Sequence, residues 1–443
     1  MQNDINSEYG CSYEPLASPP PLILPERQST PSPLSSPKRQ SMPLHLQQPA
    51  REPSIGPGSL DDIIELGLKS PVDELKKTAQ FINALRGATL EQSNMQPENI
   101  DHLRAADPDP RLDVTDRHFA KALRIFLSTT NILQATYDAI RSSMVECYPK
   151  DPFLSFRQVK RRVEQLTGIV PIFHDMCRDT CVGFTGPFAN YDQCPICGKD
   201  RYWSGTREPH WQFITILLGP VVQALYGSVD TAENMHYRER ATAEILRYAQ
   251  AHNGRLKEYT DTVCRRNYLE AVQAGMIKNG DVLVQLSLDG AQLYRDKESD
   301  CWIFVYIIHN LAPDLRYKKR FVIPACFIPG PENMKDGDSF LYPVLYHISA
   351  LQNEGLRIWD ASTQSHISHS TPFVFVTANG STMAMVLGMV GHSGKYGCRL
   401  YCGLPGCCWE RDGHYYPATL KPEAYSVAGC NHNDITFSDL IQY

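Results

Sequence analysis

The sequence has no apolar run long enough to cross a membrane. Its longest apolar runs, Ile214–Tyr226, which a Gly-Pro pair interrupts, and Trp302–Ile308, are shorter than the ~18–20 residues that a span requires. The first ten residues are polar and include Asp4 and Glu8, so the basic start and apolar stretch of an export signal are missing. We therefore expect a protein that is neither anchored in a membrane nor exported.

Two catalytic signatures and an excess of positive charge are also missing. The sequence contains no glycine-rich phosphate loop and no Gly-x-Ser-x-Gly elbow, which disfavours P-loop nucleotide hydrolases and serine hydrolases. Lys and Arg number 43 against 49 Asp and Glu, for a formal net charge of −6. This balance excludes a uniformly basic nucleic-acid coat but leaves room for local basic patches.

Proline is distributed unevenly along the 443 residues. Twelve of the 32 prolines fall within residues 11–60, and this stretch has too few large apolar residues to form a core. We therefore expect residues 1–58 to be a disordered Pro/Ser-rich tail, either solvated without a specific role or carrying Ser-Pro kinase targets. The remainder has room for two or three domains.

The segment that follows the tail is expected to be helical over residues 59–150. Thr115 is a suitable N-cap for a long helix that presents basic residues on one face and apolar residues on another. The basic face carries Arg117, Lys121 and Arg124, and the apolar face carries Phe119, Leu123, Phe126, Leu127, Leu133, Tyr137 and Ile140.

Residues 151–280 are expected to form a zinc-binding module with a helical connector. A helix over Phe156–Leu166 contains the basic run Lys160, Arg161 and Arg162. This run could contact DNA phosphates or be a solvated helix face.

The spacing of apolar residues is most regular from residue 281 onward. It predicts an antiparallel meander of strands over 281–289, 302–308 and 321–328. A helix capped by Asp338-Ser339 and ended by Gly355, a fourth strand over Pro372–Thr377 and a helix over Met383–Met389 follow. The order β-β-β-α-β-α within a mixed α/β fold is that of a ribonuclease-H-like core, which we place at 281–443.

The chain has 14 cysteines, and four of them have the spacing of a zinc site. Cys177 and Cys181 are separated from Cys194 and Cys197 by twelve residues, and Gly198 follows the second pair. Four thiolates satisfy a tetrahedral Zn²⁺ and leave no open position, so this site would be structural. The alternative is a group of unligated buried cysteines.

A second group of cysteines and histidines lies in an expected insertion at 391–417. His392, Cys398, Cys402 and His414 could form a Cys2His2 zinc site, although the spacing is looser and two further cysteines, at 407 and 408, compete for the same role. The alternative is a reduced, partly buried Cys/His loop.

Asp289 is the main catalytic candidate, because it ends the first strand of the expected core. Metal-dependent phosphoryl transfer needs hard oxygen ligands that converge from separate strands around Mg²⁺. The partner position, at the end of the fourth strand, is Asn379, whose carbonyl oxygen lacks the charge of a carboxylate. Alternatively, Asp289-Gly290 is an ordinary turn.

Ordered motifs extend from about residue 145 to the C-terminus. They are Cys181–Phe188, Cys194–Cys197, Leu217–Pro220, Ala224–Tyr226, Ser287–Tyr294, Ser299–Trp302, Pro313–Lys318, Pro329–Pro331, Gly391–Lys395, Cys398–Cys402 and Gly413–Pro417. In sequence and order they resemble the transposases of CACTA-type DNA transposons, in the Plavaka-like branch of mushroom-forming fungi.

The resemblance implies a DDE-type enzyme in which acidic residues of a ribonuclease-H-like core hold two Mg²⁺ or Mn²⁺ ions, with a zinc-binding insertion. Asp289 matches the first acid, and Asn379 stands where the family has the Asp of Thr-Ala-Asp-Gly. The third acid, a glutamate, is expected beyond Tyr443, since Glu423 is the only glutamate after the second cluster. We therefore expect a truncated, degenerate and inactive copy, unless Asp360 or Glu423 replaces the missing acid.

The partners implied by the resemblance are transposon-end DNA in the nucleus and, for assembly, further copies of the chain. A small-molecule substrate is not expected. The candidate phosphate contacts are Lys160, Arg161, Arg162, Arg316, Lys318, Lys319 and Arg320. The alternative from a different class is a zinc-stabilised protein-interaction module without a nucleic-acid role.

Overall fold

The structure is a computed structural model that describes residues 60–106, 116–129, 134–292, 300–330, 334–387, 394–397, 407–408 and 415–416. The chain divides into two units, Met1–Met42 and Pro43–Tyr443, and all described residues belong to the second. The expected tail and the four proposed ligands of the second Cys/His cluster lie outside the described residues. Among the described helices, none has the length and apolarity of a membrane span.

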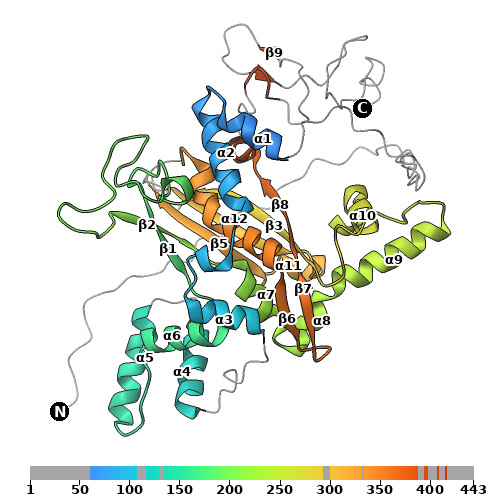
Figure 1. The fold of residues 1–443 in the computed structure, drawn as a ribbon. Coiled ribbons are helices and arrows are strands. Elements are labelled where there is room, and N and C mark those ends of the chain that lie inside the picture. The colour runs from blue at the N-terminus through green and yellow to red at the C-terminus, as the bar shows by residue number, and fades with distance from the viewer. Residues whose placement is uncertain are drawn as a thin grey trace, which may run out of the picture. The chain divides into compact units, whose positions relative to one another are not determined.

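A six-stranded sheet forms the centre of the fold, with the order β1-β2-β5-β4-β3-β8 (Figure 1). The pairings are antiparallel except that of β3 with β8, which is parallel. The expected meander and fourth strand are therefore present. The strands are β1 Ile172–Met176, β2 Trp211–Thr215, β3 Val282–Gln292, β4 Asp300–Ile308, β5 Val322–Gly330 and β8 Pro372–Ala378.

One face of this sheet packs against the long helix α12, Gly337–Glu354. Alternate residues of β3, including Val284 and Leu286, are fully buried in a core that also contains Phe340 and Val344 of the helix. The side chain of Asp336 caps α12 by accepting from the backbone N–H of Ser339 at 2.9 Å, so the cap lies two residues before the expected one. Gly355 ends the helix with φ +79°, as expected.

The other face of the sheet is covered at one end by α9, Tyr237–Ala251, and α10, Arg266–Gln273. Their core includes Leu283 of β3, and Phe375 of β8 packs against it. A hairpin of β6, Leu356–Asp360, and β7, Ser365–Ser370, was not expected from the sequence. In the chain it follows α12 and precedes β8. The last described helix, α13, spans Gly380–Val386 and begins three residues earlier than expected.

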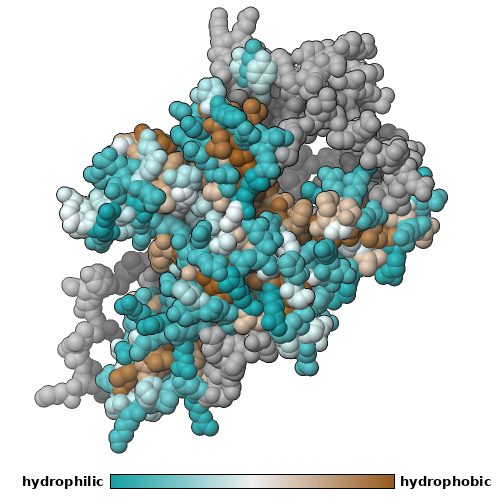
Figure 2. Space-filling model, viewed as in Figure 1, coloured by the Kyte–Doolittle hydropathy of each residue, from teal (hydrophilic) through white to brown (hydrophobic). Residues whose placement is uncertain are grey.

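Helices α1 and α2 lie before the sheet in the chain and expose an apolar surface. Figure 2 shows hydrophobic residues gathered over these two helices, where Ile63, Leu66 and Leu75 are exposed. Apart from the helices α4–α6 and two two-residue strands, the remaining described elements are α1 Leu60–Leu68, α2 Asp73–Arg86, η1 Leu90–Gln92, α3 Pro97–Ala105, η3 Gly186–Phe188, α7 Leu218–Tyr226, α8 Val229–Met235, η4 Thr262–Cys264 and α11 Pro313–Arg316.

Helices α4 Arg117–Ser128, α5 Gln134–Cys147 and α6 Phe156–Thr167 have a core of their own. The single long helix expected after Thr115 was wrong, because two helices occupy that stretch. Asp116 caps α4. The helix ends at Ser128, and the hydroxyl of the next residue, Thr129, donates to the carbonyl of Ile125 at 2.9 Å, a local bond that competes with helix continuation.

Candidate functional site

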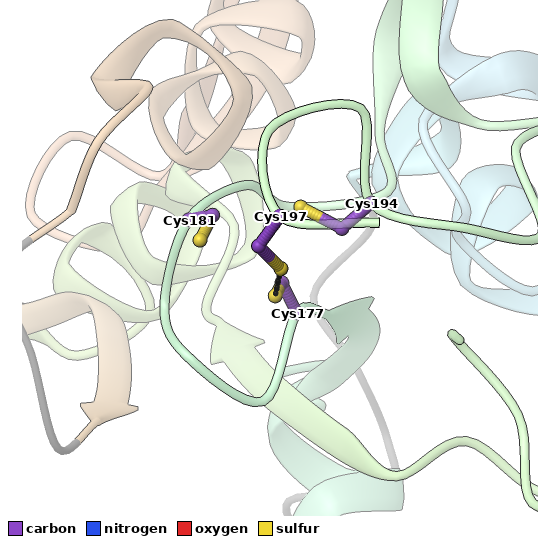
Figure 3. Close-up of side chains that lie close together, drawn as sticks. All are labelled: Cys177, Cys181, Cys194 and Cys197. Atoms are coloured by element: carbon purple, nitrogen blue, oxygen red, sulfur yellow. Dashed lines mark hydrogen bonds between the residues drawn. The ribbon is translucent and has the colours of Figure 1, made fainter. Parts of the chain in front are cut away.

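Four cysteine side chains converge in the segment that follows β1. The Sγ atoms of Cys177, Cys181, Cys194 and Cys197 lie within 4.8 Å of one another, and Figure 3 shows the four side chains close together on two loops. The Sγ atoms of Cys177 and Cys197 are 3.5 Å apart. Tetrahedral Zn–S bonds of about 2.3 Å place sulfur atoms about 3.8 Å apart, so this donor set fits a metal such as zinc.

The backbone of both loops is shaped for ligation. Thr180 has φ +54° and Gly198 has φ +72°, a left-handed conformation that suits glycine and that turns the chain sharply within the first pair and after the second. The backbone N–H of Asp179 points at Sγ of Cys177 at 3.4 Å. Such N–H···S contacts stabilise a thiolate ligand.

Burial disfavours ionisation of the free thiols of Cys177 and Cys181. It raises the pKa of Cys177 to about 11 and raises that of Cys181 further. Burial acts in the same direction on Cys197, but the backbone N–H of Lys199 and the neighbouring thiols outweigh it and lower the pKa of Cys197. A cation at the centre would compensate the buried negative charge of the ligands.

Residues 177–185 carry two of the four candidate metal ligands and are called the metal loop below. This loop is joined to the start of α12 by hydrogen bonds. The N–H of Asp336 donates to the carbonyl of Cys181 at 2.9 Å, and the N–H of Gly183 donates to Oγ of Ser339 at 3.0 Å. The Thr185 hydroxyl donates to the carbonyl of Ser339. That carbonyl cannot be bonded within the helix, because the residue four positions later is Pro343, which has no N–H.

Asp289 and Asn379, the two expected catalytic positions, lie side by side on neighbouring parallel strands. Leu288 of β3 is the register partner of Ala378, the last residue of β8, so Asn379 leaves the sheet beside Asp289. The expectation that the first strand ends at Asp289 was wrong, because β3 continues to Gln292 in its pairing with β4. Nδ2 of Asn379 donates to Oδ1 of Asp289 at 3.0 Å. Both residues are exposed.

The orientation of the Asn379 amide is fixed by a second bond. Its Oδ1 accepts from the backbone N–H of Thr382 at 3.0 Å and caps α13. Because a backbone N–H can only donate, the amide oxygen must face Thr382 and the amide nitrogen must face Asp289. The Asp289 carboxylate is thus bound by a neutral donor at the position where a second carboxylate would create a cation site.

The cysteine cluster and the Asp289–Asn379 pair lie at the same end of the sheet. The register relates Asp289 to Ile303, Phe327, Ile214 and Phe173 across β4, β5, β2 and β1, and Cys177 follows the last residue of β1. At about 4.8 Å per strand, the four steps between β3 and β1 amount to about 19 Å. The four cysteines therefore lie at the same end of the sheet as the pair but are too far from it to contribute a ligand to it.

Arg316, one of the expected DNA contacts, lies in the interior of the protein. Its side chain is fully buried, and its Nη1 and Nη2 donate to Oδ1 and Oδ2 of Asp261 at 2.9 and 2.7 Å. Its Nε donates to the carbonyl of Leu311. The guanidinium is committed to an interior ion pair, whereas Lys318, Lys319 and Arg320 after it are exposed. All four residues are basic, so their charge in the sequence could not show that Arg316 is buried and the other three are exposed.

The basic run on α6 divides in a similar way. Lys160 and Arg161 are exposed. Arg162 pairs with Oδ2 of Asp116 at 2.7 Å and lies over the ring of Phe119 at 4.3 Å, so it joins α6 to the cap of α4.

Of the second Cys/His cluster, His392, Cys398, Cys402 and His414 lie outside the described residues. The structure describes two neighbouring pairs, Tyr415 with Cys408 and Tyr416 with Cys407, as an antiparallel ladder. The proposed Cys2His2 site stays a prediction.

A cavity beside β1 was not predicted from the sequence. It has a volume of about 560 Å³ and is lined among others by Asn94, Phe173, Asp175 and Arg201. Arg201 pairs with Asp175 at 2.7 Å. Several separate chain segments between residues 94 and 220 contribute to this cavity, and no spacing motif connects them.

A comparison with protein families finds one match over the segment that carries the pair. A family model described as transposase family tnp2 matches residues 254–408, which include β3, β4, β5, α12, β8, Asp289 and Asn379. The match supports a transposase family. No curated protein matches the chain.

Proposed function

We propose that the protein is a transposase-derived DNA-binding protein of a CACTA-type DNA transposon that acts in the nucleus and has lost strand-cleavage activity. The observation that carries this proposal is the hydrogen bond from Asn379 to Asp289 within the segment matched by the transposase family. It joins the two positions at which a nuclease of this kind would hold its metal ions.

The strand order supports a ribonuclease-H-like core of the DDE type. Strands β5, β4 and β3 form an antiparallel meander, and β8 lies parallel beside β3 after the helix α12. In this arrangement β8 is the edge strand beside β3. Asn379 follows the last residue of β8 and lies next to Asp289, which is part of β3.

The chemistry of Asn379 supports the loss of activity. Two-metal phosphoryl transfer depends on anionic oxygen ligands that hold the ions close to the attacking and leaving oxygens. Asn379 offers one neutral oxygen, which already caps α13, and turns its NH₂ toward Asp289. A hard dication at this point would meet one carboxylate in place of two.

The four cysteines would hold a structural zinc ion in this proposal. With all four positions filled by protein, no open position for a reactive water remains. The ion would fix the loop that holds the start of α12 through Cys181 and Gly183.

Lys318, Lys319 and Arg320, together with Lys160 and Arg161, are the proposed DNA contacts, because their side chains are exposed. Arg162 is left out because it is held between Asp116 and the ring of Phe119, and Arg316 is left out because it is buried against Asp261. Lys160 is retained, because its contact with Glu164 is long, at 3.9 Å, and its side chain is 56% exposed. Binding through phosphates weakens as salt increases.

The test uses the full chain and duplex DNA from the genomic flanks of its gene, including any terminal inverted repeats. We expect salt-sensitive retention of this DNA and no strand cleavage with Mg²⁺ or Mn²⁺. Cleavage by the natural chain would overturn the loss of activity. Absence of DNA retention at low salt would overturn DNA binding and leave the protein-interaction alternative.

A further inference from the structure

Helices α4, α5 and α6 form a compact unit with an independent core. Tyr137 of α5 is fully buried, its ring contacts those of Phe153 and Phe156 at centroid distances of 6.2 and 5.5 Å, and its hydroxyl donates to the carbonyl of Leu154 at 2.9 Å. Phe119 of α4 and Val159 of α6 complete this core. The unit presents its polar residues outward on a rigid framework.

The charge of this unit is opposite to that of the chain. Residues 116–167 contain nine Lys and Arg against five Asp and Glu, a formal net charge of +4 in a protein whose overall charge is −6. A concentration of positive charge in about 50 residues is the electrostatic footprint expected of a nucleic-acid-binding unit.

The outward face of α6 carries a row of long donor side chains. Arg157, Lys160, Arg161 and Gln165 are exposed, whereas Val159 on the opposite side is buried. Positions 157, 161 and 165 recur every four residues, so they lie above one another along one side of the helix. At 1.5 Å per residue the 12 residues of α6 span about 18 Å.

The start of α6 is held by local hydrogen bonds. Oγ of Ser155 accepts from the N–H of Gln158 at 3.3 Å, and Oε1 of Gln158 accepts from the N–H of Ser155 at 2.8 Å. This reciprocal capping box stabilises the first turn. The donor row therefore stands on a helix whose beginning is fixed before any ligand arrives.

The cations of the unit fall into two groups. Lys121 pairs with Asp151 at 2.5 Å and Arg162 pairs with Asp116, which ties the helices together. In the part of the chain that the structure describes, no ion pair involves Arg157 or Arg161, or Arg117 or Arg124 on α4. These four exposed guanidinium groups remain available to an external anion.

We propose that α6 is a recognition helix for double-stranded DNA, with Arg157, Arg161 and Gln165 facing base edges and Lys160 contacting a phosphate. This inference rests on the proposed function, and it assigns the recognition of the DNA base sequence to one helix, α6. A single helix fits the major groove of B-form DNA, which is about 12 Å wide, and Arg and Gln pair with guanine and adenine there. The deep, narrow major groove of A-form RNA would not admit it.

The experiment compares two Arg→Gln changes in the full chain. A preferred site is first selected from a random duplex DNA library with the natural protein, and affinities are then measured at one fixed salt concentration for that site and for a scrambled duplex. Arg161→Gln is the test variant. Arg255→Gln is the matched control, because Arg255 is exposed in the turn after α9 and undergoes the same loss of charge.

The expected result is a loss of affinity for the selected site of about tenfold or more in Arg161→Gln, a smaller loss on scrambled DNA and little change in Arg255→Gln. Lys160→Gln should weaken both DNAs equally and lower the salt slope by about one. Unchanged thermal unfolding verifies that the variants fold.

Three other outcomes would overturn the inference. If Arg161→Gln and Arg255→Gln behave alike while the natural chain binds DNA, α6 does not read sequence, and the proposed function still stands. Equal affinity of the natural chain for all duplexes, or preference for single strands or duplex RNA, would also exclude a recognition helix. Absence of any DNA binding by the natural chain would instead remove the proposed function.

Discussion

Nδ2 of Asn379, the residue after β8, donates a hydrogen bond of 3.0 Å to Oδ1 of Asp289 in the neighbouring parallel strand β3. The bond joins the candidate catalytic carboxylate to an amide that is isosteric with the carboxylate of aspartate. A single change of NH₂ to O⁻ would replace an attraction between these side chains by a repulsion. The centre is therefore one substitution away from a pair of facing carboxylates, which a dication could bridge.

The first prediction concerns the variant Asn379→Asp. Two carboxylates about 3 Å apart repel each other unless a cation lies between them, so the variant should bind Mn²⁺ at least about tenfold more tightly than the natural chain. Its melting temperature should rise on addition of Mn²⁺ or Mg²⁺. Calorimetric titration and thermal unfolding measure both effects.

Asp289→Asn in the Asn379→Asp background is the control for this first prediction. It restores one amide and one carboxylate with their positions exchanged, and the added metal affinity should disappear. Equal Mn²⁺ affinity in all three proteins would place any metal site elsewhere.

The second prediction concerns metal removal. The purified chain should contain at least one zinc ion, and Cys194→Ser should lower the zinc content by one ion and the melting temperature, because structural zinc contributes directly to folding. Elemental analysis and thermal unfolding measure these changes. Cys147→Ser is the control, since Cys147 is exposed and lies outside the cluster; an equal effect of both substitutions would contradict a zinc site at Cys194.

The third prediction is that Arg316 contributes to stability, whereas the basic residues that follow it contribute to DNA binding. Arg316→Ala leaves the Asp261 carboxylate buried without its partner, and removal of one member of a buried ion pair costs about 3–5 kcal/mol. Lys318→Ala should leave the free energy of unfolding within about 0.5 kcal/mol of the natural value but weaken DNA binding. Urea unfolding decides the point, and stability losses of similar size in both variants would contradict it.

The sequence predicted the elements of the core well because their apolar periodicity is regular. Val284, Leu286 and Leu288 alternate as a half-covered strand does, and polar residues interrupt the apolar runs at Asp289 and Asn379. Asn379 follows β8 as expected, whereas β3 continues past Asp289 to Gln292. The bond between Asp289 and Asn379 could not be predicted, because it depends on the parallel register of β3 with β8. Between β3 and β8 the chain forms β4, α11, β5, α12 and the β6–β7 hairpin, so no local sequence pattern fixes that register.

Short elements and buried charges were harder to predict from sequence. β1 and β2 have five residues each, too few to establish a period, and they join the sheet only through pairing with distant β5. Arg316 stands in a basic run whose other members face solvent. Its burial depends on Asp261, 55 residues earlier, so no local pattern distinguishes it.

The fourth prediction concerns pH. Burial lowers the pKa of His347 to about 3 and, in the absence of a compensating charge, keeps the ring neutral in the folded protein. The unfolded chain binds a proton below its ordinary value near 6.5, so stability should be full above that pH and should fall as pH decreases toward 3, by up to about 1.4 kcal/mol per pH unit. His347→Gln should flatten this slope in urea unfolding at pH 7, 6 and 5. An unchanged slope would show that His347 does not contribute.

The fifth prediction tests how the metal loop is attached to α12. The carbonyl of Ser339 accepts from the Thr185 hydroxyl, because Pro343 provides no N–H for it. Thr185→Val removes the donor at nearly constant shape and leaves a buried carbonyl unpaired, at a cost of about 1–3 kcal/mol. Pro343→Ala supplies a helical N–H to the same carbonyl. If the hydroxyl acts as the substitute for that N–H, Thr185→Val should cost less in the Pro343→Ala background than in the natural chain. A double-mutant cycle by urea unfolding measures the difference, and strict additivity would mean that Thr185 stabilises the loop by packing alone.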